Sequence, residues 1–205
     1  MNRFRNIVQS ILLSSPLVLA GSVSAAPAIP SLVLAPSVGQ EKGQVDNLGI
    51  KGYAGTLRIQ KFFPTYPIFG LGLDVKYSAL DLDHGGTDIE GKRTSLAAVL
   101  PVLFPLDILG VKLDKLPKGG GPPLYVGYIF SDELELDGFS ENLKGKGWKA
   151  GLMLPAPGGA IQVEYSQVNF DDPSSSDIQT LFGSSELDSQ SWTISYHLPL
   201  VITRN

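Results

Sequence analysis

Large apolar and small polar residues alternate with a period of two along most of the chain. In residues 191–200, Trp, Ile, Tyr and Leu share one face, while Ser, Thr and His share the other. Alternation of this kind predicts a β-strand with two unlike faces. The same pattern predicts further strands in residues 52–61, 69–79, 93–104, 124–130, 147–154 and 160–166.

The polar faces of these segments are rich in Gly, Ser, Thr and Ala, and they carry only an occasional charge. A strand face in contact with water usually has more Lys, Glu and Asp. Small polar residues with a few charges suit the crowded lumen of a narrow barrel. The large apolar faces would then point outward and meet lipid, with aromatic residues near the membrane interfaces.

The links between the segments fall into two kinds. Two links, 62–67 and 155–159, are short and hold no charge. The other kind is long, acidic and rich in Ser or Gly, as in residues 81–92, 131–146 and 171–189. Bacterial transmembrane barrels have short periplasmic turns and long external loops, so the two kinds should alternate around the barrel.

Seven strands leave one missing, because single-chain bacterial barrels have an even number. Residues 29–38, which are apolar but contain two prolines, are the candidate for the first strand. The prediction is an all-β fold, an eight-stranded antiparallel up-and-down transmembrane β-barrel with both ends in the periplasm. Residues 105–122 are too long for a periplasmic turn, and they are expected either to form a short amphipathic helix or to extend the neighbouring strands.

The N-terminus predicts export. Arg3 and Arg5 precede a mostly apolar stretch over residues 7–20, and Val23-Ser24-Ala25 supplies small residues before a cleavage site. Residues 1–25 are therefore expected to be a signal peptide and residues 26–205 one barrel domain. A retained membrane anchor is the alternative, but the apolar stretch is too short and too interrupted to span the hydrocarbon.

Composition removes several classes of protein. The chain has 205 residues, of which 43% are apolar and 18% charged, with 23 Gly and 15 Pro. So much Gly and Pro argues against a helical bundle, and so much apolar side chain argues against disorder. The formal charge of −4 does not suit a nucleic-acid binder, and the absence of Cys excludes disulfides, thiolate metal sites and Cys nucleophiles.

On these features the chain resembles small bacterial outer-membrane β-barrel proteins, the eight-stranded group that includes the OmpA transmembrane domain, OmpW and OmpX. The resemblance covers most of residues 26–200 and includes the signal peptide, the segment PPLYVGYIF at 122–130 and the last segment, SWTISYHLPL. In that group the last strand is an assembly signal that usually ends in Phe. This chain departs from that pattern and ends LPLVITRN, with Tyr196 available as an internal aromatic residue.

Charged and titratable residues on the predicted inward faces are the candidate site. A lumen ion-pair and hydrogen-bond network is the main interpretation, and a narrow anion-preferring path or a small-ligand pocket is the alternative. The residues are Arg58, Asp74, Lys76, Arg93, Lys149, Glu164 and His197.

His197 also allows an enzymatic interpretation. Together with Ser195 and Glu164 it could form a Ser–His–acid group, and some outer-membrane barrels act on the acyl groups of lipid A. The chain has none of the local motifs of those enzymes, so no catalytic residue is expected.

Two of the long links could hold further sites. Residues 81–92, with Asp81, Asp83, His84, Asp88 and Glu90, begin like a calcium loop but lack its later ligands. They are expected to be a solvated acidic loop, with a weak cation site as the alternative, so no metal is assigned. Residues 171–189 contain a small apolar island, Ile178, Leu181 and Phe182, which could be flexible, cap the barrel or contact a partner.

The sequence therefore predicts a protein of the Gram-negative outer membrane with a structural, surface-interaction or small-solute passage role, and no enzyme. A barrel enzyme acting on envelope lipids and a soluble, lipocalin-like carrier of a hydrophobic ligand are the alternatives. No cofactor and no nucleic-acid partner are expected. The expected partners are outer-membrane lipid, the barrel-assembly machinery and an unknown extracellular ligand, and the protein is expected to be a monomer.

Overall fold

The computed structural model describes residues 30–63, 66–103, 123–184 and 186–204. The expected signal peptide and the segment 105–122 lie outside these residues. No helix in the described part of the chain is long and apolar enough to cross a membrane. The elements are β1 (Pro30–Val45), β2 (Leu48–Phe63), β3 (Tyr66–His84), β4 (Thr87–Leu103), β5 (Pro123–Leu136), β6 (Leu143–Ala156), β7 (Gly159–Phe170), α2 (Ser176–Phe182), β8 (Leu187–His197) and β9 (Leu200–Arg204).

The strands form one closed barrel. Each strand from β1 to β8 pairs antiparallel with the next, and β8 pairs with β1 from Ser37↔His197 to Val45↔Ser189. β9 continues the eighth strand beyond Pro199 and pairs with the beginning of β1. Pro199 has no backbone N–H to donate, which accounts for the interruption between β8 and β9. The predicted eight-stranded antiparallel up-and-down barrel is therefore confirmed.

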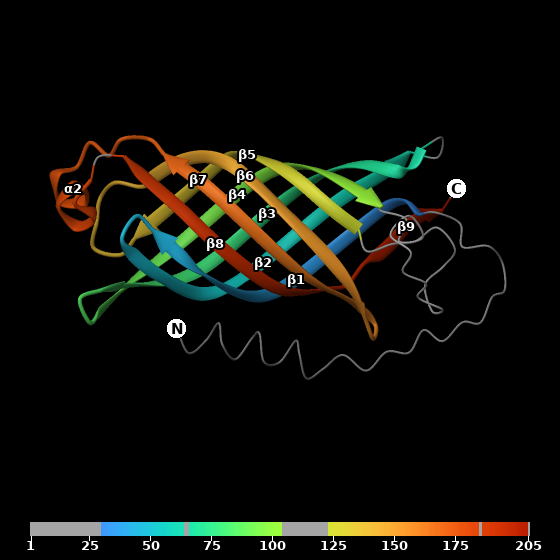
Figure 1. The fold of residues 1–205 in the computed structure, drawn as a ribbon, viewed down its shortest axis with the longest axis horizontal. Coiled ribbons are helices and arrows are strands. Elements are labelled where there is room, and N and C mark those ends of the chain that lie inside the picture. The colour runs from blue at the N-terminus through green and yellow to red at the C-terminus, as the bar shows by residue number, and fades with distance from the viewer. Residues whose placement is uncertain (1–29, 64–65, 104–122, 185, 205) are drawn as a thin grey trace, which may run out of the picture.

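The two ends of the barrel differ (Figure 1). One end, called here the helix end, carries residues 46–47, 85–86, 137–142 and 171–184, with α2 in the last of these segments. The opposite end, called here the turn end, carries β9 and the tight turn at residues 157–158. The N-terminal end of β1 lies at the turn end, beside β9.

Several predicted boundaries at the helix end are wrong. The first strand does not stop at residue 38 but runs to Val45. The long acidic loop expected at 81–92 is a hairpin of β3 and β4, with a turn at Gly85 and Gly86, whose φ values are 60° and 91°. Two glycines with positive φ make the kind of tight turn that joins antiparallel strands without a longer loop.

The other two long links are also shorter than expected. β5 continues to Leu136 and β6 begins at Leu143, so the loop between them is residues 137–142 and not 131–146. In the link predicted at 171–189, the apolar island forms α2, and Ile178 and Phe182 are buried. Gly183, with φ 73°, ends this helix in the left-handed conformation that favours glycine.

The outer wall exposes many large apolar side chains, in keeping with the predicted alternation. We call this set the apolar belt. Its residues are Tyr53, Leu57, Ile59, Phe63, Phe69, Leu71, Leu73, Val75, Tyr77, Leu100, Leu124, Val126, Tyr128, Phe130, Trp148, Leu154, Ile161, Trp192, Ile194, Leu198, Leu200, Val201 and Ile202.

The lumen is filled in layers. At the helix end, buried apolar side chains pack together with those of α2, and we call this cluster the apolar plug. Below it the lumen is lined by charged and hydroxyl side chains. The residues of the plug are Val45, Leu48, Ile50, Leu80, Leu82, Ala97, Ile129, Leu134, Leu136, Leu143, Val168, Phe170, Ile178, Phe182 and Leu187.

Candidate functional site

The structure places all seven residues of the predicted lumen set inside the barrel. Alternation sets this orientation, because each residue stands on the face opposite its outward apolar neighbours. All seven are buried, and they come from β2, β3, β4, β6, β7 and β8. Six of the seven take part in ion pairs, and His197 makes none within the described ranges.

The first group of charges is built around Asp74. Arg58 lies directly opposite Asp74 in the β2–β3 register, and its Nε and Nη2 atoms donate to the two carboxylate oxygens at 2.7 Å each. Lys149 Nζ lies 2.6 Å from Asp74 Oδ2 and 3.2 Å from Glu164 Oε2. The bidentate pair is the strongest geometry available to Arg and a carboxylate.

Tyr125 contacts both a cation and a carboxylate of this group. The Arg58 guanidinium lies over the Tyr125 ring, 3.9 Å from its centroid, and the Tyr125 hydroxyl donates to Glu164 Oε2 at 2.6 Å. The tyrosine therefore stacks on the cation and also hydrogen-bonds the anion, so it holds both at a fixed separation.

The second group of charges is built around Glu41 and Asp132. Lys76 Nζ lies 3.0 Å from Glu41 Oε2, and Arg93 Nη1 lies 3.5 Å from Glu41 Oε1. Arg93 Nε also donates to Asp132 Oδ1 at 2.8 Å. Ser95 donates to the Asp132 carboxylate as well.

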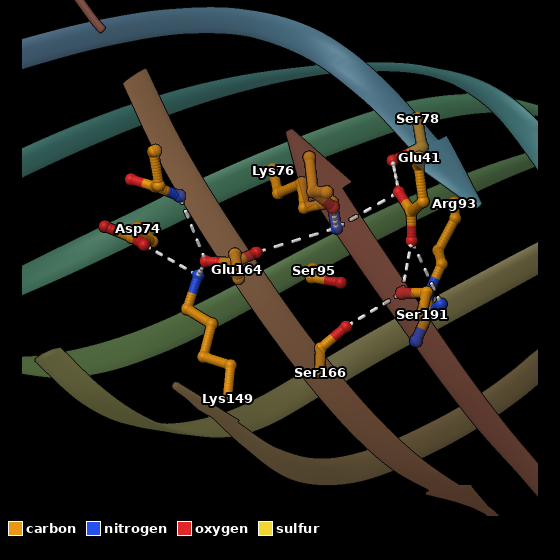
Figure 2. A network of polar contacts seen from close by, with 12 residues as sticks. Glu41, Asp74, Lys76, Ser78, Arg93, Ser95, Lys149, Glu164, Ser166 and Ser191 are labelled. Carbon is orange, nitrogen blue, oxygen red and sulfur yellow. Dashed lines mark hydrogen bonds and ion pairs between the residues drawn. The ribbon is translucent and has the colours of Figure 1, made fainter. Parts of the chain in front are cut away.

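Serine hydroxyl groups also donate hydrogen bonds to the carboxylate oxygens of this second group. Ser78 and Ser191 donate to the two oxygens of Glu41, at 2.6 and 2.7 Å. Lys76 connects the two groups of charges, because its ammonium lies 3.7 Å from Glu164 Oε1 and donates to Thr193 at 2.9 Å. Figure 2 shows Lys76 between Glu164 on one side and Glu41 on the other.

We call these eight buried residues the charged network, and their charges balance. The network has four cations and four carboxylates: Arg58, Lys76, Arg93, Lys149, Glu41, Asp74, Asp132 and Glu164. A buried ion needs a partner, because the loss of its hydration is costly. The arrangement provides one for every member.

Sequence reasoning missed Glu41 and Asp132. Both fall beyond the strand ends expected from the sequence, at residue 38 for β1 and residue 130 for β5. Two signals could have found them. Alternation from Ser37 through Gly39 places Glu41 inward, and four lumen cations facing only two carboxylates require two further anions.

His197 makes no hydrogen bond or ion pair with the charged network in the described part of the chain. It is directly opposite Ser37 in the β1–β8 register and is buried. Neither of its ring nitrogens has a hydrogen-bond partner among the described residues, and the same holds for the Ser195 hydroxyl. The described geometry therefore contains no hydrogen-bonded Ser–His–acid relay through His197.

The acidic residues of the β3–β4 hairpin lie along the two strands and do not converge on one point. Asp83 Oδ1 accepts a hydrogen bond from the Gly86 N–H at 3.3 Å, and Asp88 lies 3.4 Å from Lys51. Within the described ranges, no group of three or more His, Asp or Glu side chains could hold a metal ion.

A carboxylate connects the two longest segments of the helix end. Glu141 accepts hydrogen bonds from the N–H groups of Ser174 and Ser175, at 2.9 and 2.7 Å, and from the Ser174 hydroxyl at 2.8 Å. These three bonds lower the pKa of Glu141 below its ordinary value of 4.5. The contact joins the 137–142 loop to the segment that leads into α2, so it helps to hold α2 over the plug.

The fold and the lumen define a class: small, closed, up-and-down β-barrels with an apolar exterior and a filled interior. No protein-family model and no curated protein matches the sequence. Three solved structures of outer-membrane barrels are similar in fold. The chain aligns with neisserial surface protein A (NspA) at 12% identity over 82% of this chain and 96% of that one, with a TM-score of 0.49.

The other two alignments are of the same kind. Outer membrane protein OprG from Pseudomonas aeruginosa aligns at 10% identity over 86% of this chain and 99% of that one, with a TM-score of 0.42. Ail, the attachment invasion locus protein of Yersinia pestis, aligns at 15% identity over 80% and 97%, with a TM-score of 0.39. The fold assignment for the present chain rests on its own strand pairing.

Proposed function

We propose that this chain is an outer-membrane β-barrel protein with a structural or surface-interaction role and no catalytic activity. The observation that carries the proposal is the apolar belt on a barrel without open edges. Large apolar side chains in such number are unfavourable in water, whereas a bilayer accommodates them. Closure also satisfies the backbone polar groups of the wall, which lipid cannot do.

The filled lumen favours a structural or surface role over passage of a solute. The charged network crosses the interior from β1 to β7, and the apolar plug closes the helix end. An eight-stranded barrel has an interior just wide enough for its side chains. The lumen therefore works as a core, and the parts left to interact with other molecules are the helix end and the outer wall.

The two alternatives receive less support. A soluble carrier of a hydrophobic ligand needs an apolar cavity and a polar exterior. At the level of the belt this barrel has the opposite arrangement, with apolar side chains outside and charged side chains inside. An enzyme acting on lipids needs an activated nucleophile, and the Ser195 hydroxyl has no hydrogen-bond partner in the described part of the chain.

The proposed topology places the helix end outside the cell and the turn end in the periplasm, since the longer connections of such barrels are external. Export would use residues 1–25, and insertion would use the barrel-assembly machinery, with a monomer in the outer membrane. A protease or an epitope tag that reaches residues 137–142 on whole cells tests this orientation.

Membrane fractionation combined with a heat-modifiability gel tests the proposal. We expect the full chain in the outer-membrane fraction, with a mobility that changes on boiling, and no conductance when the folded barrel is placed in a planar bilayer. Protein in the soluble fraction, with no change on boiling, would overturn the membrane assignment. Regular conductance steps would overturn the closed lumen and restore solute passage as the function.

A further inference from the structure

A groove of about 450 Å³ lies on the outer wall near the helix end, over β1 to β4. Ala79 on β3 forms part of its floor. Its cross-strand partners are Tyr53 on β2 and Lys92 on β4, and both have much longer side chains. Gly52 and Gly91 also line the groove, which is therefore a hollow over small residues between larger ones.

Three lysines from three strands line this groove: Lys42, Lys51 and Lys92. Lys42 and Lys51 are direct cross-strand partners. Lys42 makes no ion pair among the described residues. Lys51 lies 3.4 Å from Asp88 and Lys92 lies 4.0 Å from Asp137, with every one of these side chains more than half exposed. Exposed pairs of this kind are weak, so a phosphate can compete for the lysines.

The groove lies where the outward side chains of the wall change from charged to apolar. Outward side chains along β3 run from Asp81 through Ala79 to Tyr77 and Val75, that is, from charged to aromatic to aliphatic. Tyr53 and Tyr77 line the groove and belong to the apolar belt. Aromatic girdles of membrane barrels lie at the interface, so the groove is at the level of lipid head groups.

The groove also contains hydrogen-bond acceptors. Asp81 and Glu90 are direct cross-strand partners, and both line it. A carboxylate repels a phosphate but accepts hydrogen bonds from sugar hydroxyls, and a tyrosine ring can lie against the apolar face of a sugar. The combination of lysines, carboxylates and aromatic rings suits a head group that carries both phosphate and saccharide.

We propose that this groove binds the phosphorylated saccharide head group of a glycolipid in the outer leaflet. The lysines contact phosphate, the two tyrosines contact the sugar ring, and Asp81 and Glu90 accept from its hydroxyls. The inference rests on the proposed insertion of the barrel with its helix end outward, and it adds a lipid partner to that function.

The test uses the full folded chain in phosphatidylcholine vesicles that contain a minor fraction of a phosphorylated diglucosamine lipid. After extraction in mild detergent, the lipid retained per barrel is measured by mass spectrometry. Parallel vesicles contain the same lipid without its phosphates, or phosphatidylglycerol. We expect retention of the phosphorylated glycolipid at a level well above that of the other two.

Variants locate the binding. Lys42→Ala with Lys92→Ala should lower retention about tenfold, which corresponds to about 1.4 kcal/mol lost from two exposed contacts. The matched control is Lys144→Ala with Lys146→Ala on β6, which removes the same charge from exposed positions outside the groove. Ala79→Trp fills the groove without a change of charge and should also lower retention.

Three results would overturn the inference: equal loss in the groove and control variants, equal retention of the dephosphorylated lipid, or equal retention of phosphatidylglycerol. A change of gel mobility on boiling is recorded for every sample. A barrel that inserts normally and shows one of these results contradicts only the lipid site. A barrel that does not insert contradicts the proposed function and the inference together.

Discussion

The apolar plug and the charged network fill the same lumen, yet they are built from opposite kinds of side chain. Around the plug, the wall carries charged residues outward, such as Lys51, Asp83 and Glu90, and apolar residues inward. Around the network, the wall is apolar outward and charged inward. The polarity of the barrel therefore reverses along its axis.

The reversal shows which force holds each region together. In the proposed topology, water surrounds the wall at the level of the plug, where burial of apolar side chains stabilises the interior as in a soluble protein. Lipid would surround the wall at the level of the network, where an apolar interior would gain nothing over the outside, so ion pairs and hydrogen bonds hold the strands together there. Each of the following substitutions acts on one of these two regions.

The largest effect is expected in the charged network. Asp74→Leu removes the carboxylate that pairs with both Arg58 and Lys149, and loss of one partner from a buried pair costs about 3–5 kcal/mol. Urea unfolding of the vesicle-inserted barrel, followed by gel mobility, measures it. The control is Leu73→Ala on the adjacent outward position, which is 58% exposed and should change stability much less. Similar losses at the two positions would show that the network is not the stabilising element.

A smaller loss is expected in the plug. Leu82 is fully buried there, and Leu82→Ala should cost about 3 kcal/mol through lost burial and the cavity that remains. The same urea experiment measures the loss, and hydrogen exchange should increase first at the helix end. A loss of protection around Asp74 and Glu164 without one in α2 would contradict the separation of the two regions.

A pH-dependent effect is expected at the helix end. The pKa of Glu141 is lowered in the folded state, so its contribution is present above the ordinary value of 4.5 and is lost as the pH falls through the folded pKa. At pH 7, Glu141→Ala should increase protease cleavage in residues 171–184. As the pH falls from 4.5 through the lower folded pKa, the sensitivity of the wild type should approach that of the variant. A difference between the two proteins that persists unchanged at low pH would exclude this carboxylate as the cause.

The smallest effect is expected at His197. Both of its ring nitrogens are buried without a hydrogen-bond partner among the described residues, so His197→Leu breaks no hydrogen bond within this part of the chain. Replacing such a group by an apolar one of similar size is nearly neutral, and we expect a change in unfolding free energy within about 1 kcal/mol. A loss as large as that of Asp74→Leu would show that His197 belongs to the charged network.

The same reversal of polarity explains how far the sequence could predict the structure. Period-two alternation with large apolar residues on one face identified the strand segments at the level of the belt, and with them the inward side of Arg58, Lys149 and Glu164. The same alternation does not locate the strand ends near the plug, because the apolar residues move from the outward to the inward face there. Leu80 and Leu82 point inward on β3, whereas Val75 and Tyr77 point outward.

The sequence does contain a pattern that indicates the end of β5. Glu133-Leu134-Glu135-Leu136 alternates as a soluble strand does, with its leucines buried in the plug. The sequence prediction places this stretch in an acidic loop, so it misses both the end of β5 and the inward position of Asp132. The packing of α2 on the plug could not be predicted either, since nothing local specifies where a short apolar island will be buried.

The charged outer wall around the plug also affects the position of the barrel along the membrane normal. In the proposed topology, Lys51, Asp83 and Glu90 stand on the outer wall just outside the hydrocarbon. Movement of the barrel toward the periplasm would bring these charges into the lipid and strip them of water, which is costly. The charged wall around the plug therefore limits how deeply the barrel can rest in the membrane.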